Sequence, residues 1–302
     1  MSFNNQSLFL RPVMQMKHIF TVDVEDWYHG YPPEYLVGHK RTLRLDRGLT
    51  LLFEELDRTN TKGTFFWLAT QAALYPKLIR ECVALGHEIG CHGLNHTPIY
   101  WQSREIFHAQ IREALKILED TSFQQIESYR APFFSVRQDS LWALEILVSL
   151  GFKYDASILP MRHWRTGMSN ESDLIHEILT PSGNIIEVPV SISNTFGIRH
   201  PTAGGGFFRA YPYKFTRRSF SQATDLFKPV VFYTHPWEYD TARPTMPFWS
   251  LQTMLNRIHI GSTARKLRSL LEEFCFAPLS EIAAEEIAKQ QLKSGKVISP
   301  IR

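Results

Sequence analysis

Short apolar runs alternate with longer segments of helical periodicity along most of this 302-residue chain. A parallel α/β sheet produces such an alternation, because each strand needs a crossover segment that returns the chain to the same end of the sheet. The predicted strands are His18–Val24, Gly63–Leu68, His87–His92, Glu127–Ala131, Phe152–Ser157 and Val230–Thr234. The predicted helices are Leu45–Thr59 with Asp46 as its N-cap, Gln71–Leu85, Ser103 to about Glu119, Gln138–Leu150 and Ser280–Lys293.

Polar residues capable of chemistry stand at the predicted carboxyl ends of these strands. They are Asp23, His92, Arg130, Asp155 and His235. Active sites in parallel α/β folds assemble at that edge of the sheet. The sequence therefore predicts one site there and favours a barrel-like arrangement.

Residues 160–228 interrupt the alternation. We expect a strand pair at Leu174–Leu179 and Ile185–Val190, joined by the Pro-Ser-Gly-Asn turn at 181–184. We interpret this region, including the glycine-rich segment Gly204–Phe208, as an elaborated loop or inserted hairpin. Residues 1–17 are interpreted as an N-terminal extension, and residues 276–302 as a C-terminal helix with a loose tail.

Two histidines, His92 and His96, follow a predicted strand and lie four residues apart. They can converge on one metal ion if the segment between them makes about one helical turn. One added carboxylate gives the His-His-Asp/Glu ligand set of a hydrolytic zinc-type site with an open position. A further carboxylate could accept a proton from water. This pattern predicts a metal-dependent hydrolase.

The carboxylates of such a site are available in the segment Asp23-Val24-Glu25-Asp26. Asp23 lies between two valines, and an acid inside an apolar run needs a partner or a function. Asp23 and Glu25 share one face of a strand, which would place a base and a metal ligand side by side. If the strand has already turned, Asp26 could be the ligand instead.

Two cationic or titratable residues complete the candidate set. Arg130 is a lone cation between apolar residues, and a buried arginine usually pairs with a carboxylate. A pair with Asp23 would keep that base ionised and oriented. His235 follows the apolar run Val230–Thr234 and could protonate a leaving amine.

Together these residues resemble the polysaccharide deacetylase family, also called the NodB-homology family or carbohydrate esterase family four. The resemblance covers roughly residues 18–275 and rests on four motifs in order: Thr21-Val22-Asp23-Val24-Glu25-Asp26, His92-Gly93-Leu94-Asn95-His96, Arg130-Ala131-Pro132-Phe133 and Thr234-His235-Pro236-Trp237. The forms Val-Asp-Val-Glu-Asp-Trp, Gly-Gly-Gly-Phe-Phe-Arg and His-Pro-Trp-Glu resemble the subfamily associated with exopolysaccharide loci and exosortase systems.

The resemblance implies a distorted (β/α) barrel, a divalent metal (usually Zn²⁺) and hydrolysis of N-acetyl groups on amino sugars. His92, His96 and one acid of the first strand would bind the metal, while a second acid would be the base. Arg130 would orient that base, and His235 would be the general acid. The backbone N–H of Phe133 would help to hold the tetrahedral oxyanion.

The family pattern often has two adjacent aspartates, whereas this chain has Asp-x-Glu-Asp. Asp23 as base leaves Glu25 as ligand; Glu25 as base leaves Asp26 as ligand. We favour the first assignment, since Asp23 and Glu25 share a strand face. Asp155 is expected at the edge of the pocket, and Phe134 and Trp237 are candidates for stacking on sugar rings.

The composition excludes several other classes. The net charge is only +3 and the densest basic group, Arg257–Arg268, has the spacing of a solvated helix, which argues against nucleic-acid binding. Three cysteines without a CxxC pair indicate neither a disulfide framework nor a cysteine zinc site. No apolar run reaches the roughly 18 residues of a membrane span. Met1–Lys17 lacks the layout of a signal peptide, with Met16 as an alternative start, so we expect a cytoplasmic protein.

Two other functions fit parts of the pattern. An allantoinase-like hydrolase of small cyclic amides would use the same scaffold and metal. A catalytically inactive, glycan-binding member is the second alternative, although the presence of all the motif residues argues against it. The preferred expectation is a deacetylase acting on an N-acetylated glycan or on a glycan precursor inside the cell.

Overall fold

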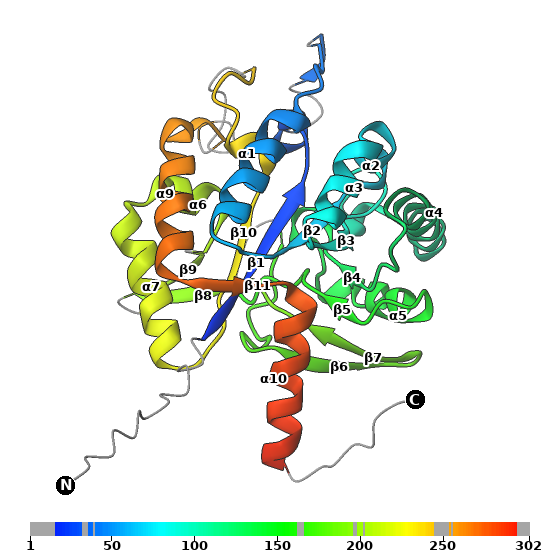
Figure 1. The fold of residues 1–302 in the computed structure, drawn as a ribbon. Helices are drawn as coiled ribbons and strands as arrows, with labels where there is room; N and C mark the ends of the chain where they lie inside the picture. The colour runs from blue at the N-terminus through cyan, green and yellow to red at the C-terminus, as the bar shows by residue number, and fades with distance from the viewer. Residues whose placement is uncertain are drawn as a thin grey trace, which may run out of the picture.

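The computed structural model describes residues 16–31, 36–38, 40–161, 166–195, 198–201, 203–244, 254 and 256–294. Within them, nine strands form one curled sheet in the order β10-β1-β2-β3-β4-β5-β7-β6, with β11 also paired to β1 (Figure 1). Its strands are β1 (Lys17–Val24), β2 (Thr64–Trp67), β3 (Glu88–Cys91), β4 (Ser128–Tyr129), β5 (Tyr154–Asp155), β6 (His176–Thr180), β7 (Gly183–Glu187), β10 (Val231–Thr234) and β11 (Cys275–Ala277).

All neighbouring strands of this sheet run parallel except β6 and β7, which form an antiparallel hairpin. The parallel α/β arrangement with a curled, half-barrel sheet confirms the fold class predicted from the alternation of strands and helices. Because β1 lies between β10 and β2, its carboxyl end stands next to those of both neighbours. Residues that follow these three strands are thereby brought to one edge of the sheet.

Helices surround the sheet on the outside, as Figure 1 shows for α1 to α5 on one side and α7 and α9 on the other. Their bounds are α1 (Leu45–Arg58), α2 (Ala69–Leu74), α3 (Pro76–Ala84), α4 (Arg104–Ser122), α5 (Trp142–Ser149), α6 (Gly205–Ala210), α7 (Tyr213–Asp225), α9 (Ile260–Glu273) and α10 (Leu279–Ser294). A separate two-stranded sheet joins β8 (Ile192–Thr195) to β9 (Ile198–Pro201).

Several helix predictions are confirmed and two need correction. Ser103 caps α4 by accepting a hydrogen bond from the Ile106 N–H at 3.3 Å. Helix α1 begins at Leu45, as predicted, and its N-cap residue is Arg44. Asp46 is therefore not the N-cap and lies in the first turn of the helix. The single helix predicted for Gln71–Leu85 is two helices, because Pro76 cannot donate a backbone hydrogen bond and starts α3.

The region 160–228 contains more regular structure than we expected. The hairpin of β6 and β7 is present, and β7 extends the main sheet by pairing with β5. The segment Gly204–Phe208 is not a loop, because α6 begins at Gly205, and α7 follows it. Only two residues of α7, Thr216 and Phe220, are buried, and so short an apolar stripe is hard to recognise as a helix from the sequence.

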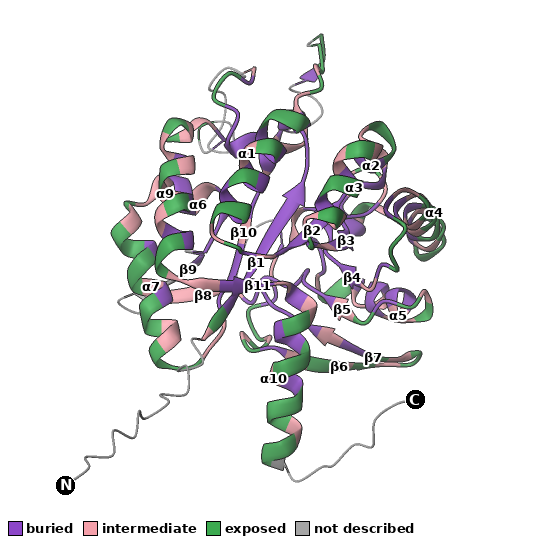
Figure 2. Cartoon of the chain, viewed as in Figure 1, coloured by how far each residue is buried: buried purple, intermediate pink, exposed green. Residues whose placement is uncertain are grey.

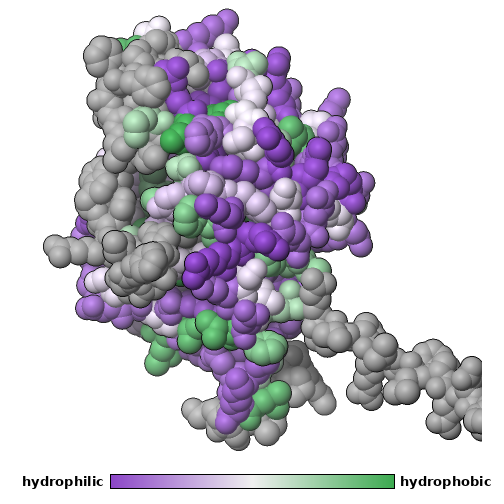
Figure 3. Space-filling model, turned by 90° about the vertical axis from the view of Figure 1, so that its left-hand side faces the viewer, coloured by the Kyte–Doolittle hydropathy of each residue, from purple (hydrophilic) through white to green (hydrophobic). Residues whose placement is uncertain are grey.

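The C-terminal segment also belongs to the main sheet. Strand β11 pairs with β1, and α10 packs on a second apolar cluster that includes Ile19, Leu279 and Ile282. The larger core lies between the sheet and the other helices, and Figure 2 shows the buried strands enclosed by helices with exposed outer faces. Figure 3 shows a side of the molecule where apolar residues are scattered among hydrophilic ones. Among the described helices, none has the length and apolar character needed to cross a membrane.

Candidate metal centre

One carboxylate and two imidazoles meet just beyond the ends of β1 and β3. The Glu25 Oε1 atom lies 3.1 Å from Nε2 of His92 and 2.8 Å from Nε2 of His96. These three residues form a group whose ligand atoms all lie within 4.8 Å of one another. Burial by itself would raise the pKa of Glu25, but the nearby His96 and His235 lower it. The carboxylate is therefore held in its charged form.

The hydrogen bonding of His92 shows that this group fits a cation. Its Nδ1 lies 2.8 Å from the backbone carbonyl of Arg130, and a carbonyl can only accept, so Nδ1 carries the proton. In a neutral ring Nε2 then presents a lone pair toward the Glu25 carboxylate. His96 Nε2 is buried and faces the same carboxylate oxygen at 2.8 Å. Two lone pairs and a carboxylate facing one point are the donor set that a divalent metal requires.

The segment between the two histidines is not helical, which corrects the expectation of one helical turn. It is an irregular turn in which Gly93 and His96 have φ angles of +87° and +64°. The carbonyls of Gly93 and Leu94 accept hydrogen bonds from Ala69 and Thr70 at the start of α2. These hydrogen bonds satisfy backbone N–H groups in the first turn of α2 that have no partner within the helix. They also fix the turn in the conformation that places the His96 ring beside His92.

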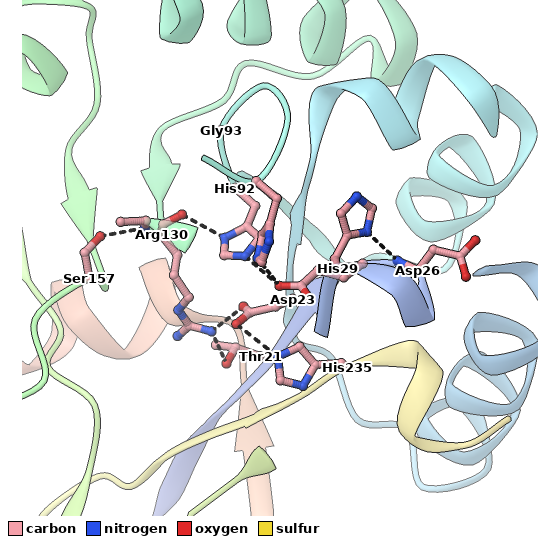
Figure 4. Close-up of polar contacts among 12 residues, drawn as sticks. Thr21, Asp23, Asp26, His29, His92, Gly93, Arg130, Ser157 and His235 are labelled. Carbon is pink, nitrogen blue, oxygen red and sulfur yellow. Dashed lines mark hydrogen bonds and ion pairs between the residues drawn. The ribbon is translucent and has the colours of Figure 1, made fainter. Parts of the chain in front are cut away.

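Asp26 lies apart from the histidines. Its two carboxylate oxygens accept hydrogen bonds from the backbone N–H groups of Trp27 and Arg44, both at 2.8 Å. Figure 4 shows its side chain pointing away from His92. Of the two acids left open as ligands, the structure brings Glu25 to the histidines and gives Asp26 a structural role at the start of the following turn.

Asp23 and Arg130 form a buried ion pair beside this group. The Arg130 Nη1 donates to Asp23 Oδ1 and to Thr21 Oγ1, both at 2.8 Å, and Nε donates to the Ala156 carbonyl at 3.2 Å (Figure 4). The guanidinium also lies over the Phe66 ring, 4.4 Å from its centroid. These contacts fix one oxygen of Asp23 and leave Oδ2 turned toward His235.

His235 faces Asp23 from the end of β10. Its Nε2 lies 4.0 Å from Asp23 Oδ2, and its Nδ1 lies 2.6 Å from Glu238 Oε1. Burial lowers the pKa of His235, but the carboxylates of Glu25, Glu238 and Asp23 outweigh it and raise the pKa to about 9. The residue is thereby held as a cation with a proton available at Nε2.

Phe133 and Phe134 follow Arg130 in a strained turn. Both have positive φ, +59° and +52°, which costs energy for residues other than glycine. The Phe133 ring packs 4.4 Å from the His96 ring, so this residue lies beside the candidate ligands. Phe134 is half-buried, with its ring 5.1 Å from Tyr233 and 5.4 Å from the Arg130 guanidinium.

Asp155 and Trp237, both expected to contact substrate, are buried. Asp155 is fully buried and accepts a hydrogen bond from Ser157, whose Oγ in turn accepts from the Ala131 N–H at 2.8 Å. Trp237 is only 6% exposed and stacks on His235 at 5.1 Å. A ring so enclosed leaves almost no surface for a sugar, so burial argues against the substrate contacts expected of both residues.

Sequence reasoning missed three residues that contact the site. His29 lies 5.4 Å from the His96 ring and accepts a hydrogen bond from the Asp26 N–H. Glu238 binds His235, and Arg209 binds Glu238. Glu238 could have been found, since it stands three residues after His235 in one short turn. Arg209 ends the Gly-Gly-Gly-Phe-Phe-Arg motif, but no local spacing connects it with Glu238, which it reaches from α6.

The site and fold match proteins of known family. The profile described as polysaccharide deacetylase matches residues 48–154. This segment therefore matches the polysaccharide deacetylase family. A second profile, described as a domain of unknown function, DUF3473, matches residues 156–284.

Curated relatives resemble parts of the chain. A peptidoglycan-N-acetylglucosamine deacetylase of Bacillus cereus is 26% identical over 31% of this chain and 34% of its own length. A chitooligosaccharide deacetylase of Azorhizobium caulinodans is 28% identical over 42% of this chain and 58% of its own length. The chain thus spans between about a third and three fifths of these two relatives.

Solved structures extend the likeness to the whole fold. A Mycobacterium smegmatis protein assigned to the polysaccharide deacetylases has a TM-score of 0.62 at 17% identity, covering 94% of both chains. The Puue allantoinase has a TM-score of 0.60 at 14% identity, covering 93% of this chain and 91% of its own. At these identities the likeness establishes the fold alone.

Proposed function

We propose that this protein is a metal-dependent hydrolase that removes N-acetyl groups from amino sugars of a polysaccharide or its precursor. The observation that carries the proposal is the convergence of Glu25, His92 and His96 beside Asp23, with His235 opposite. Such an arrangement combines a cation site, a carboxylate and a protonated imidazole at one edge of the sheet. These are the components of metal-assisted amide hydrolysis.

Glu25, His92 and His96 would hold the metal, for which Zn²⁺ is the first candidate because two imidazoles and one carboxylate suit it. When bound, the ion would polarise the acetyl carbonyl and lower the pKa of a water molecule. Supporting this assignment, His92 donates its other ring N–H to a backbone carbonyl, as zinc-binding histidines usually do.

The remaining residues would move protons and orient the substrate. Asp23 would accept a proton from the attacking water, while Arg130 holds its other oxygen in place. The backbone N–H of Phe133 would stabilise the developing oxyanion. His235 would give the proton on Nε2 to the amine nitrogen as the C–N bond breaks.

The proposed substrate class is an N-acetylated glycan. Two relatives act, by their descriptions, on peptidoglycan N-acetylglucosamine and on chitooligosaccharides. Phe134 is the proposed aromatic contact for a sugar ring, because it remains half-buried beside Phe133. A role in exopolysaccharide biosynthesis, on a precursor within the cell, follows from the motif forms and is part of the same proposal.

Acetate release tests the function directly. Purified protein loaded with Zn²⁺ would be incubated with N-acetylglucosamine oligomers, with Asp23→Asn protein in parallel. We expect acetate from the wild type and very little from the variant at equal metal content. Metal-loaded wild type that releases no acetate, but hydrolyses allantoin, would replace the glycan with a small cyclic amide.

A further inference from the structure

We propose that Glu238 and Arg209 form a positioning relay that fixes His235 for proton donation. This inference rests on the proposed function and assigns a role to the segment matched by the profile of unknown function. Arg209 lies in α6, Glu238 lies in a short 3-10 turn at Pro236–Glu238, and His235 precedes that turn. Neither of the two motifs that supply the proposed metal ligands and base contributes to this relay.

Glu238 is a fully buried carboxylate whose oxygens are occupied by specific partners. Oε1 lies 2.6 Å from His235 Nδ1 and 2.8 Å from Arg209 Nη1, and Oε2 accepts from Thr234 Oγ1 at 3.2 Å. Burial alone would raise the pKa of Glu238, but Arg209 and His235 lower it. The ionised carboxylate can only accept at Nδ1, so the proton of a neutral His235 stays there and Nε2 remains the working nitrogen.

Aromatic contacts fix the ring plane as well. Trp237 stacks on His235 with an interplanar angle of 22°, and the Arg209 guanidinium lies 5.0 Å from the Trp237 ring centroid. Arg209 therefore reaches His235 through the carboxylate and through the indole. With Nδ1 and the ring plane both fixed, Nε2 points to Asp23 Oδ2, across the place where water would attack.

Backbone glycines allow α6 to lie this close to β10. A Cβ atom at Gly204 would meet the Tyr233 carbonyl oxygen at 2.2 Å, and one at Gly205 would meet the Tyr233 ring at 2.8 Å. Tyr233, which lies two residues before His235, donates its backbone N–H to the Ala203 carbonyl at 3.0 Å. The Gly-Gly-Gly-Phe-Phe-Arg segment thus combines close approach to the His235 strand with an arginine that reaches Glu238.

In the reaction the relay would act on one proton. As the amide C–N bond breaks, the nitrogen keeps the bonding electron pair and takes the proton from His235 Nε2. His235 becomes neutral, with its remaining proton held between Nδ1 and Glu238. A substrate whose leaving group departs without protonation should not need this step.

The test compares Glu238→Gln with wild type on N-acetylglucosamine oligomers and on 4-nitrophenyl acetate. For the variant we expect kcat on the amide to fall about 10²-fold with KM within about twofold, and ester turnover to fall less than about threefold. Arg209→Met should also lose more turnover on the amide than on the ester, but with a smaller fall in kcat than Glu238→Gln. The Arg209→Met/Glu238→Gln double variant removes both buried charges and keeps the test available if either single variant misfolds.

Asp240→Asn is the matched control. Asp240 pairs with Arg44 and lies two residues after Glu238, but none of its contacts reaches His235. It should lower the thermal midpoint without changing the amide-to-ester ratio. Equal losses on amide and ester in Glu238→Gln, or no loss on either, would overturn the relay.

A spectroscopic readout separates this inference from the proposed function. In ¹⁵N-histidine-labelled protein, with His235 assigned through His235→Gln, the Nδ1 signal should report a strongly hydrogen-bonded proton that shifts in Glu238→Gln. An unchanged signal would overturn the relay even if the wild type releases no acetate. Absence of acetate with an altered signal would instead count against the glycan substrate alone.

Discussion

Two buried groups of carboxylates in this protein have opposite surroundings. Asp23 and Glu25 are faced by Arg130, His92, His96 and His235. Asp155 and Glu187 instead face each other, and burial raises the pKa of both. The first pair is held by a guanidinium and imidazoles at the edge of the sheet, while the second lies within it, on β5 and β7, with the pKa of both carboxyls raised.

The difference shows that the surroundings of a buried carboxylate, and not its residue type, decide whether it can take part in a reaction or has a structural role. A carboxylate surrounded by donors and cations stays charged and can bind a metal or accept a proton. A carboxylate opposed to another carboxylate in the core is kept protonated and serves as a hydrogen-bonding strut. Here that strut reaches Ala131, next to Arg130, through Ser157.

The largest expected effect comes from breaking the first group. His92→Ala removes one ligand of the candidate metal centre, so bound Zn²⁺ and acetate release should both fall to background. Metal content by atomic absorption and turnover would be measured on the same dialysed sample. His108→Ala, on α4, is the control and should keep both; metal retained by His92→Ala would contradict the ligand assignment.

Asp23→Asn should separate metal binding from turnover. The substitution keeps the shape but removes the proton acceptor, so we expect full metal content and a fall in kcat of about 10²- to 10⁴-fold. Initial rates and metal content would be recorded together. If the variant loses its metal instead, Asp23 is a ligand and the assignment of base and ligand is wrong.

A smaller effect is expected from the strut. Ser157→Ala leaves the buried Ala131 N–H without its acceptor, which should cost about 1–3 kcal/mol of stability. The thermal midpoint would be measured with metal bound. Ser149→Ala, which removes only the hydroxyl of an exposed residue of α5, is the control. Equal shifts of the thermal midpoint in both variants would show that the Ser157 hydrogen bond has no special structural role.

The smallest expected effect depends on pH. The pKa of Glu187 is raised in the fold from its ordinary value of 4.5, so its stabilising contribution is present below that value and is lost as pH rises through the raised pKa. Glu187→Gln keeps a hydrogen-bonding partner for Asp155 without a second charge. Its thermal midpoint relative to wild type should increase between pH 5 and pH 8, by roughly 2–4 °C. A constant difference across that range would mean that Glu187 is ionised throughout.

Particular residues show how far the sequence could predict this structure. The motif residues Asp23, His92, Arg130 and His235 stand at the carboxyl ends of predicted strands, and parallel order alone brings strand ends to one edge. The ion pair of Arg130 with Asp23 followed from a charge inside an apolar run. Both predictions rest on local sequence together with one rule of topology.

Other features depended on packing that the sequence does not display. The turn between His92 and His96 is set by contacts with α2, and β11 is a short strand that becomes visible only against β1. Asp155 was expected to be a site residue because it ends a strand, but in the structure its carboxyl is buried and hydrogen-bonded to Glu187 of β7. Arg209 reaches Glu238 only because glycines bring α6 against β10. Partners from distant elements therefore decide the role of each polar side chain.

Metal binding by Glu25→Gln and Asp26→Asn tests the proposed ligand set directly. Zinc titration with a competing chromophoric chelator would be run on both variants and on the wild type. We predict one tightly bound Zn²⁺ per chain for the wild type and for Asp26→Asn, and loss of that site in Glu25→Gln. Zinc retained by Glu25→Gln and lost by Asp26→Asn would contradict the account.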